Sequence, residues 1–159
     1  WILACRAAGA AVYLDAEGEL LRQSVTAGPA LIKPNQAELS GVMGRPLTTE
    51  DETIRAAQEL LAQGVGCVTV TMGAGGALLC WEDCVLRCES PRVPVGSTVG
   101  AGDSVVAALA YAQQRQLSRE DTARLAMATG AANVMCSGTQ AARLGDIEQL
   151  LPQVRVTRL

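Results

Sequence analysis

Apolar and polar positions alternate with the period of a helix in TTEDETIRAAQELLAQG, residues 48–64. A threonine opens this segment, acidic residues fill its first turn and Gly64 closes it, all of which are helix start and stop signals. CVTVTMG, at 67–73, is instead rich in β-branched residues and predicts a strand. GGALLCW at 75–81 and CVLRCE at 84–89 predict the two strands of a β-hairpin.

The rest of the pattern predicts strands that alternate with helices. Asn35 has Glu38 three residues further on, the spacing of a helix capping box. Further helices are expected up to about Ala8 and over residues 19–25, 102–115, 118–136 and 146–151, and further strands over 11–14 and 30–33. Such alternation is typical of an α/β fold, a mostly parallel sheet with helices on both faces. Ligands of these sheets bind beyond the carboxyl ends of the strands.

Composition narrows the function classes. The chain has 159 residues, 49% of them hydrophobic, 18% charged, and a net charge of −3, which suits one globular domain and gives no electrostatic footprint for nucleic acid or an anionic membrane. It has no histidine, which excludes histidine triads, bases and metal ligands. No apolar run reaches the roughly 18 residues of a membrane span. The opening WILACRAAGAAVYLD begins inside a helix without Met, so we expect a piece of a longer protein.

Three of the six cysteines, Cys80, Cys84 and Cys88, have the spacing C-x3-C-x3-C. Structural zinc sites usually combine two separated pairs, often with histidine, whereas these cysteines lie within the expected hairpin. Buried, reduced thiols in a cytosolic protein are therefore favoured, with a metal site or a disulfide as the alternative.

GSTVGAGDSVVAALAYA, residues 96–112, is the strongest candidate for chemistry. Gly100 and Gly102 let the backbone approach a ligand, and the start of the following helix offers unpaired N–H groups to an anion. The carboxylate of Asp103 would repel a phosphate bound there, so its position needs an explanation. One explanation is that Asp103 takes a proton from a hydroxyl that attacks the phosphorus. Ordinary helix capping is the alternative explanation of the same aspartate.

A second glycine-rich loop, TMGAGG at 71–76, follows the strand at 67–73. It lacks the third glycine of a dinucleotide fingerprint, since position 78 is Leu. It also lacks the lysine that a P-loop requires. Thr71 and Gly73 could contact phosphates from the side, and a tight turn between strands is the alternative.

A third candidate, KPNQAE at 33–38, lies where a strand meets a helix. Lys33, Asn35 and Glu38 could place a positive charge and a magnesium–water site at the sheet edge, with a plain capping box as the alternative. Asp15, at the end of its own strand, is a similarly ambiguous carboxylate.

These motifs together resemble the PfkB, or ribokinase-like, carbohydrate kinase family. The resemblance rests on STVGAGDS, IKPNQAELSGVMGRPL and VTMGAGGALL, and covers the C-terminal half of a usual member. The tail SGTQAARLGDIEQLLPQV is most similar to the 1-phosphofructokinase and tagatose-6-phosphate kinase branch. The resemblance implies a three-layer ribokinase-like sandwich, with residues 1–159 as one partial domain that lacks the N-terminal sugar-binding half and lid.

The resemblance also implies phosphoryl transfer from Mg·ATP to a sugar phosphate, with fructose 1-phosphate as the favoured acceptor. Tagatose 6-phosphate or fructose 6-phosphate, or a catalytically incomplete nucleotide-binding fragment, is the alternative. Asp103 would be the base, and the amides of Gly100, Ala101 and Gly102 the anion hole. The residues expected to contact the nucleotide are Lys33, Asn35, Thr71, Gly73, Gly76, Val95, Ala132 and Cys136.

Metals and partners follow from the same resemblance. Glu38 would hold Mg²⁺ through water, and Ser97 and Val99 fall where some relatives bind a monovalent cation such as K⁺. The expected partners are a sugar phosphate and ATP, with no nucleic acid and no membrane, a homodimer of the full-length protein, and a cytoplasmic location. A dinucleotide-dependent oxidoreductase is disfavoured by the faulty fingerprint after Thr71.

Overall fold

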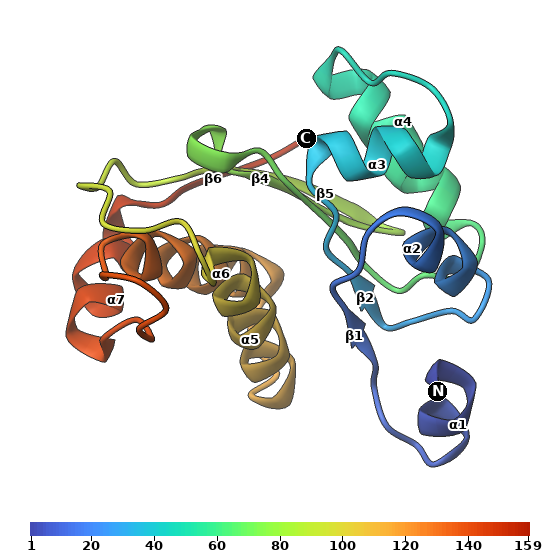
Figure 1. The fold of residues 1–159 in the computed structure, drawn as a ribbon, viewed down its shortest axis with the longest axis horizontal. Coiled ribbons are helices and arrows are strands. Elements are labelled where there is room, and N and C mark those ends of the chain that lie inside the picture. Colours follow the sequence, from blue (N-terminus) through green and yellow to red (C-terminus); the bar gives the residue numbers. More distant parts are fainter. The chain divides into compact units, whose positions relative to one another are not determined.

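A computed structural model describes all residues 1–159, and the chain divides into two compact units. The N-terminal unit comprises Trp1–Met72 and Leu78–Val85, and the C-terminal unit comprises Gly73–Ala77 and Leu86–Leu159. Six strands form a mixed sheet in which they follow one another in chain order, β1-β2-β3-β4-β5-β6 (Figure 1). The two units are described in turn.

The N-terminal unit alternates strands with helices. Its elements are α1 (Ile2–Ala7), β1 (Tyr13–Leu14), α2 (Gly18–Val25), β2 (Leu31–Ile32), α3 (Gln36–Met43), α4 (Glu50–Leu61), β3 (Val68–Thr71) and most of β4 (Ala77–Trp81). The pairs β1–β2 and β2–β3 are parallel. Both α3 and α4 contact β3, and a buried core is shared by α2, α3, α4, β2, β3 and β4.

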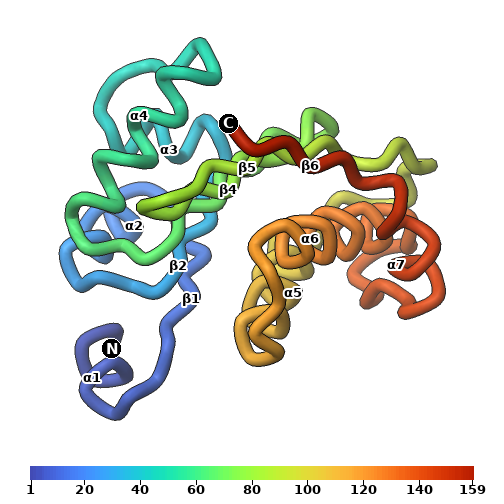
Figure 2. The backbone as a smooth tube through the Cα atoms, turned by 180° about the vertical axis from the view of Figure 1, so that it is seen from behind, coloured from blue at the N-terminus to red at the C-terminus, as the bar shows by residue number.

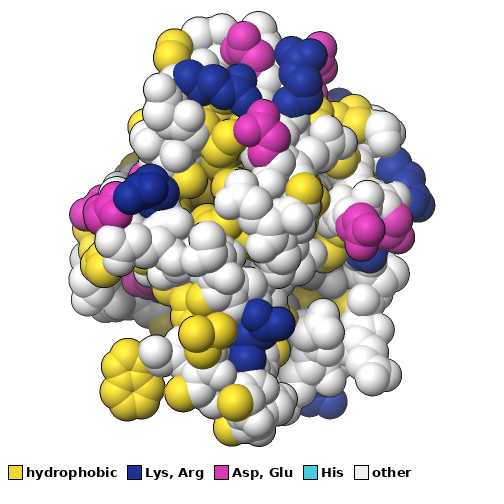
Figure 3. All heavy atoms as spheres, turned by 90° about the vertical axis from the view of Figure 1, so that its right-hand side faces the viewer, with side chains coloured by type: hydrophobic (Ala, Val, Ile, Leu, Met, Phe, Trp, Pro, Cys, Tyr) yellow, Lys and Arg dark blue, Asp and Glu magenta, His cyan; other side chains and the backbone are white.

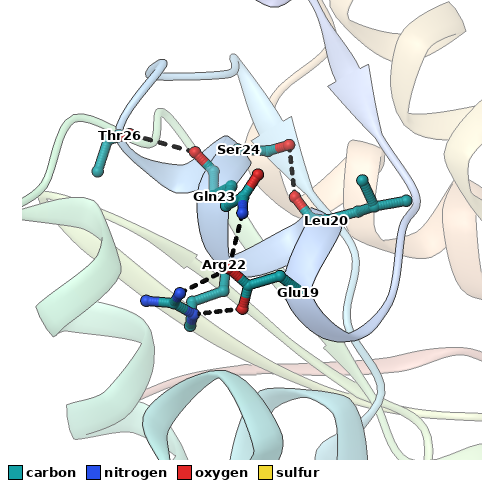
Figure 4. A network of polar contacts seen from close by, with 6 residues as sticks. All are labelled: Glu19, Leu20, Arg22, Gln23, Ser24 and Thr26. Atoms are coloured by element: carbon teal, nitrogen blue, oxygen red, sulfur yellow. Dashed lines mark hydrogen bonds and ion pairs between the residues drawn. The ribbon is translucent and has the colours of Figure 1, made fainter.

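Helix α2 has hydrogen-bonded polar side chains on its exposed side and apolar side chains on its buried side. On its exposed side, Glu19 accepts hydrogen bonds from Arg22 Nε at 2.7 Å and Gln23 Nε2 at 2.7 Å (Figure 4). Exposed ion pairs of this kind contribute little to stability because solvent screens them. Leu21 and Val25 are fully buried, so burial of this apolar side fixes the helix.

The C-terminal unit contains the glycine-rich segment 96–103 and the helices that follow it. Its elements are η1 (Gly73–Gly75), most of β5 (Cys84–Glu89), α5 (Ala101–Gln114), α6 (Arg119–Val134), α7 (Leu144–Leu150), η2 (Leu151–Gln153) and β6 (Arg155–Arg158). Helix α6 packs against α5, α7 and β6. Strand β6 runs antiparallel to β5, and Figure 2 shows the two side by side.

The sequence predicted the type of nearly every element. Strands β1 and β2 are shorter than the expected ranges 11–14 and 30–33, and β6 was not predicted at all. The expected parallel sheet is confirmed for β1 to β3, whereas β5 and β6 are antiparallel because β6 returns alongside the hairpin strand. None of the helices combines the length and the hydropathy that crossing a membrane requires.

Charged side chains are scattered over the face of the molecule drawn in Figure 3. On the face drawn in Figure 3, basic and acidic side chains alternate with apolar ones and form no large patch of one sign. All six cysteines are free thiols, and no group of three or more His, Cys, Asp or Glu side chains is gathered as a metal site.

Candidate functional site

The start of α5 has an unusual backbone. Gly100 is the N-cap residue and adopts the left-handed conformation with φ of 85°, which glycine tolerates far better than other residues. No side chain caps the helix. Ser104 N donates to Gly100 O at 2.9 Å and Ala101 N donates to Thr98 O at 3.4 Å, while the other N–H groups of the first turn have no helical carbonyl to reach. The turn therefore offers N–H groups and a positive dipole end to an anion.

Asp103 lies in the first turn of this helix, and its side chain is exposed. A carboxylate that reaches solvent beside unpaired N–H groups is accessible to a substrate hydroxyl. A general base must first lie within hydrogen-bond reach of the proton that it takes, and only then does its pKa matter. Asp103 and the glycine turn therefore belong to one helix start, and their chemical roles belong to the proposal below.

The loop before α5 is fixed by the end of α6. Gly96 N and Ser97 N both donate to Val134 O, at 2.8 and 3.1 Å, and Val99 N donates to Ser97 Oγ at 3.2 Å. A Cβ atom at Gly96 would lie 2.8 Å from Met135 O, so only glycine allows this close approach. Ser97 and Val99, the two expected cation-site residues, thus share one ordered turn.

The three residues expected to line the adenine pocket differ in exposure. Val95 is 71% exposed, Cys136 is half-buried and Ala132 is fully buried. Cys136 Sγ contacts Ala132 O at 3.5 Å and Ala141 O at 3.6 Å. Val95 precedes the loop that is anchored on α6, so it lies close to the end of that helix. The side chains of Val95 and Cys136 are therefore accessible to a ligand, whereas the buried Ala132 could only support the residues that contact one.

One polar residue of this unit was not singled out from the sequence. Asn133 is only 4% exposed, and its Nδ2 donates to Gln140 O at 2.9 Å. Its Oδ1 is buried without a hydrogen-bond partner, which typically costs about 1–3 kcal/mol. The only signal available in the sequence was a polar amide in the otherwise apolar and small run ATGAANVM.

The second glycine motif divides into an open and a packed part. Gly73 is exposed, has φ of 56° and has open space where a side chain would be. Gly76 has φ of 92°, and a Cβ atom there would overlap the Cys88 carbonyl oxygen. Close packing against β5 therefore explains the glycine at position 76, while Gly73 leaves its backbone accessible.

In the N-terminal unit, the ends of the parallel strands gather the other candidates. Lys33 Nζ lies 3.1 Å from Asp15 Oδ2, and the side chains are 7% and 33% exposed. Asn35 pairs with Thr71 in an isolated parallel bridge, and Thr71 N donates to Pro34 O at 3.0 Å. The structure thus brings these expected phosphate-contacting residues to one edge of the sheet, where a buried lysine is paired with an acid.

Glu38 acts as a capping residue. Its Oε2 accepts from Asn35 N at 2.9 Å, and Asn35 Oδ1 accepts from Glu38 N at 2.9 Å, which completes a capping box on α3. The capping alternative is therefore confirmed for these two residues. Mg²⁺ keeps several waters and usually needs only one or two carboxylates besides substrate phosphates, so the capping role of Glu38 does not conflict with the magnesium role expected for it.

Comparisons with known proteins show the family. Residues 1–144 match the family described as pfkB family carbohydrate kinase. The chain is 38% identical over 160 residues to 1-phosphofructokinase of Haemophilus influenzae, covering all of this chain and 51% of the relative. It is 46% identical over 123 residues to 1-phosphofructokinase of Rhodobacter capsulatus, covering 77% of this chain and 39% of the relative. The chain belongs to the pfkB carbohydrate kinase family.

Solved structures agree with this result. Phosphofructokinase-2 of Escherichia coli, in complex with substrates and products, has a TM-score of 0.90 and 34% identity, covering 96% of this chain and 50% of that one. Ribokinase of Arabidopsis thaliana, complexed with ribose and ATP, has a TM-score of 0.83 and 27% identity, covering 94% of this chain and 50% of that one. The fold is the ribokinase-like α/β fold, and the chain spans about half the length of the relatives it matches.

Proposed function

We propose that this chain supplies the nucleotide-binding and catalytic-base half of an ATP-dependent sugar-phosphate kinase, as one partial domain over residues 1–159. The observation that carries the proposal is the turn from Gly100 to Asp103. A left-handed glycine cap there presents first-turn N–H groups, and an exposed carboxylate stands directly beside them. Anion binding and proton acceptance at one helix start are what phosphoryl transfer to a hydroxyl requires.

In this reaction, the Asp103 carboxylate takes the proton of the acceptor hydroxyl. The hydroxyl oxygen then forms a bond to the γ-phosphorus of ATP, while the bond from that phosphorus to the β-phosphate oxygen breaks and ADP leaves. The N–H groups of Gly100, Ala101 and Gly102 would stabilise the charge on the transferring group, and Ala101 N would exchange its 3.4 Å hydrogen bond to Thr98 O for one to the phosphate. The proton on Asp103 is released to solvent after transfer.

Residues of the N-terminal unit are further candidates for contact with phosphate. Lys33 supplies the positive charge, held in place by Asp15 at 3.1 Å. Asn35 and Thr71, which pair backbone to backbone, would contact phosphate oxygens, with Gly73 and Gly76 contributing the following turn. Mg²⁺, when bound through water at Glu38, would neutralise phosphate charge. Val95, Ala132 and Cys136 would line the adenine pocket.

A monovalent cation is part of the proposal. Phosphofructokinase-2 of Escherichia coli has been solved in complex with potassium. In this chain, Ser97 and Val99 share one ordered turn immediately before the anion-binding helix start. We propose that carbonyl groups of this turn hold K⁺, which would add positive charge next to Gly100.

The acceptor we favour is fructose 1-phosphate, with fructose 1,6-bisphosphate as product. Several relatives that match this chain over nearly its whole length are named 1-phosphofructokinase. An ATP-dependent 6-phosphofructokinase isozyme 2 of Escherichia coli also matches, at 34% identity, so fructose 6-phosphate is the second candidate, with tagatose 6-phosphate the third. We expect the kinase to act in the cytoplasm and its full-length form to be a homodimer. Phosphofructokinase-2 of Escherichia coli has been solved in a tetrameric inhibited form.

Calorimetric titration of this chain with Mg·ATP, with NADH as the control ligand, tests the proposal. Saturable binding of ATP without binding of NADH is the expected result. A folded chain that binds neither ligand would contradict a nucleotide site built from these residues, and binding of NADH would favour a dinucleotide enzyme instead. Binding of ATP without transfer to fructose 1-phosphate would favour the alternative of a nucleotide-binding fragment.

A further inference from the structure

The last turn of α6 supports the loop that leads into α5. Val134 O accepts hydrogen bonds from Gly96 N at 2.8 Å and Ser97 N at 3.1 Å. The side-chain amide of the neighbouring Asn133 lies beside the N-cap residue of α5, near the space that a side chain at Gly100 would occupy. A Cβ atom at Gly100 would lie 3.6 Å from Asn133 Oδ1 and 3.9 Å from Nδ2. One helix turn therefore borders both the loop and the glycine that shape the anion-binding turn.

The same amide connects to a third segment. Asn133 Nδ2 donates to Gln140 O at 2.9 Å, so the donor end holds the segment after α6 while the oxygen end lies beside Gly100. Oδ1 is buried and unpaired, and it lies near the start of α5, where the helix dipole is positive. The partial negative charge on this oxygen is thus attracted to the same helix end that would attract a phosphate.

The hydrogen bond to Gln140 O accounts for the donor end of the Asn133 amide, but no contact within the chain accounts for its buried, unpaired oxygen. An apolar side chain of similar size would fill the space and would leave no buried oxygen unpaired. Unsatisfied buried polar groups call for a specific reason, and departures from local rules concentrate at functional sites.

We propose that Asn133 is a positioning residue that fixes Gly100 and its neighbouring N–H groups in the geometry that receives the phosphate. This inference rests on the proposed function, because it assigns Asn133 to the anion hole of that site. The amide acts through Gly100 and touches no reacting atom. A turn held in place before binding does not have to reorganise when the phosphate arrives, which is how preorganised donors gain their effect.

The test is Asn133→Leu in this 159-residue chain, with Gln140→Ala as the matched control. The control keeps the contact because the acceptor at position 140 is a backbone carbonyl. Three quantities are measured for each variant: the melting temperature, the Kd for Mg·ATP, and the hydrogen-exchange rates of the Ala101 and Ser104 amides. These two amides form the first hydrogen bonds of the turn, to Thr98 O and Gly100 O.

For Asn133→Leu we expect an unchanged or raised melting temperature, a Kd for Mg·ATP that rises at least about threefold, and exchange at Ala101 and Ser104 that accelerates at least about threefold. Gln140→Ala should leave all three quantities unchanged. A merely structural asparagine would give the opposite pattern: a lower melting temperature with unchanged Kd and unchanged local exchange. That pattern would overturn the proposal.

The experiment separates this inference from the proposed function. Faster exchange at the two amides in a chain whose wild type binds no Mg·ATP would support the positioning role while contradicting the nucleotide site. Unchanged exchange would overturn the positioning role whether or not ATP binds. If Asn133→Leu does not fold, Asn133→Ala, which also removes the side-chain amide, is expected to give the same shifts in Kd and in amide exchange, at a lower melting temperature. Failure of both variants to fold would make Asn133 structural.

Discussion

At the residue scale, Asp103 and Asp121 form a natural comparison, because both are acids in the first turn of a long helix. Asp121 belongs to a capped turn, in which Ser118 Oγ accepts from Asp121 N at 3.1 Å. The turn before Asp103 has no side-chain cap and begins with a left-handed glycine. The same residue type thus serves helix stability in one place and is free to meet a substrate in the other.

Asp103→Asn should leave Mg·ATP binding by this chain intact within about threefold, because the amide keeps the size of the side chain and removes a charge that repels phosphate. In a form of the protein that turns over, the same change should lower kcat by about 10²–10⁴-fold, the usual contribution of a general base. Titration calorimetry and a coupled ADP-release assay measure the two effects. Asp121→Asn is the control and should change neither, and an Asp103→Asn variant with wild-type kcat would remove this aspartate from its role.

Local sequence was enough to find the Gly100–Asp103 turn, because a helix start, its glycines and its acid lie within a few neighbouring residues. It was not enough to find Asn133. The importance of this residue depends on contacts with Gly100 and Gln140, which no periodicity encodes. The pairing of Lys33 with Asp15 likewise required the parallel register of β1 and β2, although both residues were candidates beforehand.

At the element scale, capping chemistry was the most reliable signal in the sequence. Thr49 and Glu52 form a complete capping box on α4, and the Glu52 carboxylate also accepts from Thr48 N at 2.7 Å and Thr48 Oγ1 at 2.9 Å. These hydrogen bonds, those from Thr48 first, lower the pKa of Glu52 to about 2. The charged form is therefore favoured in the folded state.

A lowered pKa in the folded state makes the contribution of Glu52 to stability depend on pH. The contribution is present above the unfolded value of 4.5 and is lost as the pH falls toward 2, where the carboxylate protonates. The melting temperature of Glu52→Gln should therefore lie below that of the wild type at pH 6, and the difference should shrink between pH 4.5 and 2. Glu148→Gln, on the exposed side of α7, is the control; a constant difference for Glu52→Gln would contradict the lowered pKa.

Close packing of α5 on α6 depends on a glycine. A Cβ atom at Gly130 would lie 2.8 Å from Val105 Cγ2, and the stiff valine side chain has little freedom to move away. Gly130→Ala should therefore destabilise the protein by about 1 kcal/mol, since an overpacking cost of about 1–3 kcal/mol exceeds a helix-propensity gain of up to about 1 kcal/mol. Urea denaturation measures this change.

The matched test adds Val105→Ala to Gly130→Ala. Removing the valine methyl groups relieves the overlap, so the double variant should be more stable than the sum of the two single changes predicts. Additive effects would show that the two positions do not meet. A stabilising Gly130→Ala would show that helix propensity, rather than packing, decides this position.

Strand ends were the weakest part of the prediction from sequence. Pairing, rather than composition, sets the limits of β1 and β2, and each of these strands spans only two residues. Strand β6, with the sequence RVTR, has only one apolar residue to distinguish it from a loop. Its pairing with β5 arises from a register in which Val156 lies opposite Cys88 and Arg155 opposite Glu89. Such partners are found only when distant segments are brought together.

At the scale of the whole molecule, the reactivity of the cysteine thiols shows whether the core is packed or open. Cys67, Cys80, Cys84 and Cys88 are buried, while Cys5 and Cys136 are half-buried. Burial raises the pKa of Cys80 and of Cys88 to about 12. Because the thiolate is the reactive form, these thiols should be nearly inert near pH 8 as long as the protein stays folded.

Labelling with a disulfide reagent at pH 8 should therefore show a fast phase from Cys5 and Cys136 and a much slower phase, limited by opening of the structure, from the four buried thiols. Cys5→Ser should remove half of the fast phase and isolate Cys136. Mg·ATP should then slow the reaction of Cys136, because the proposed adenine pocket includes this side chain, but should not slow the reaction of Cys5 in Cys136→Ser. Mass spectrometry identifies each labelled site. Fast labelling of all six thiols would contradict the packed core, and equal rates at Cys136 with and without bound nucleotide would remove this residue from the pocket.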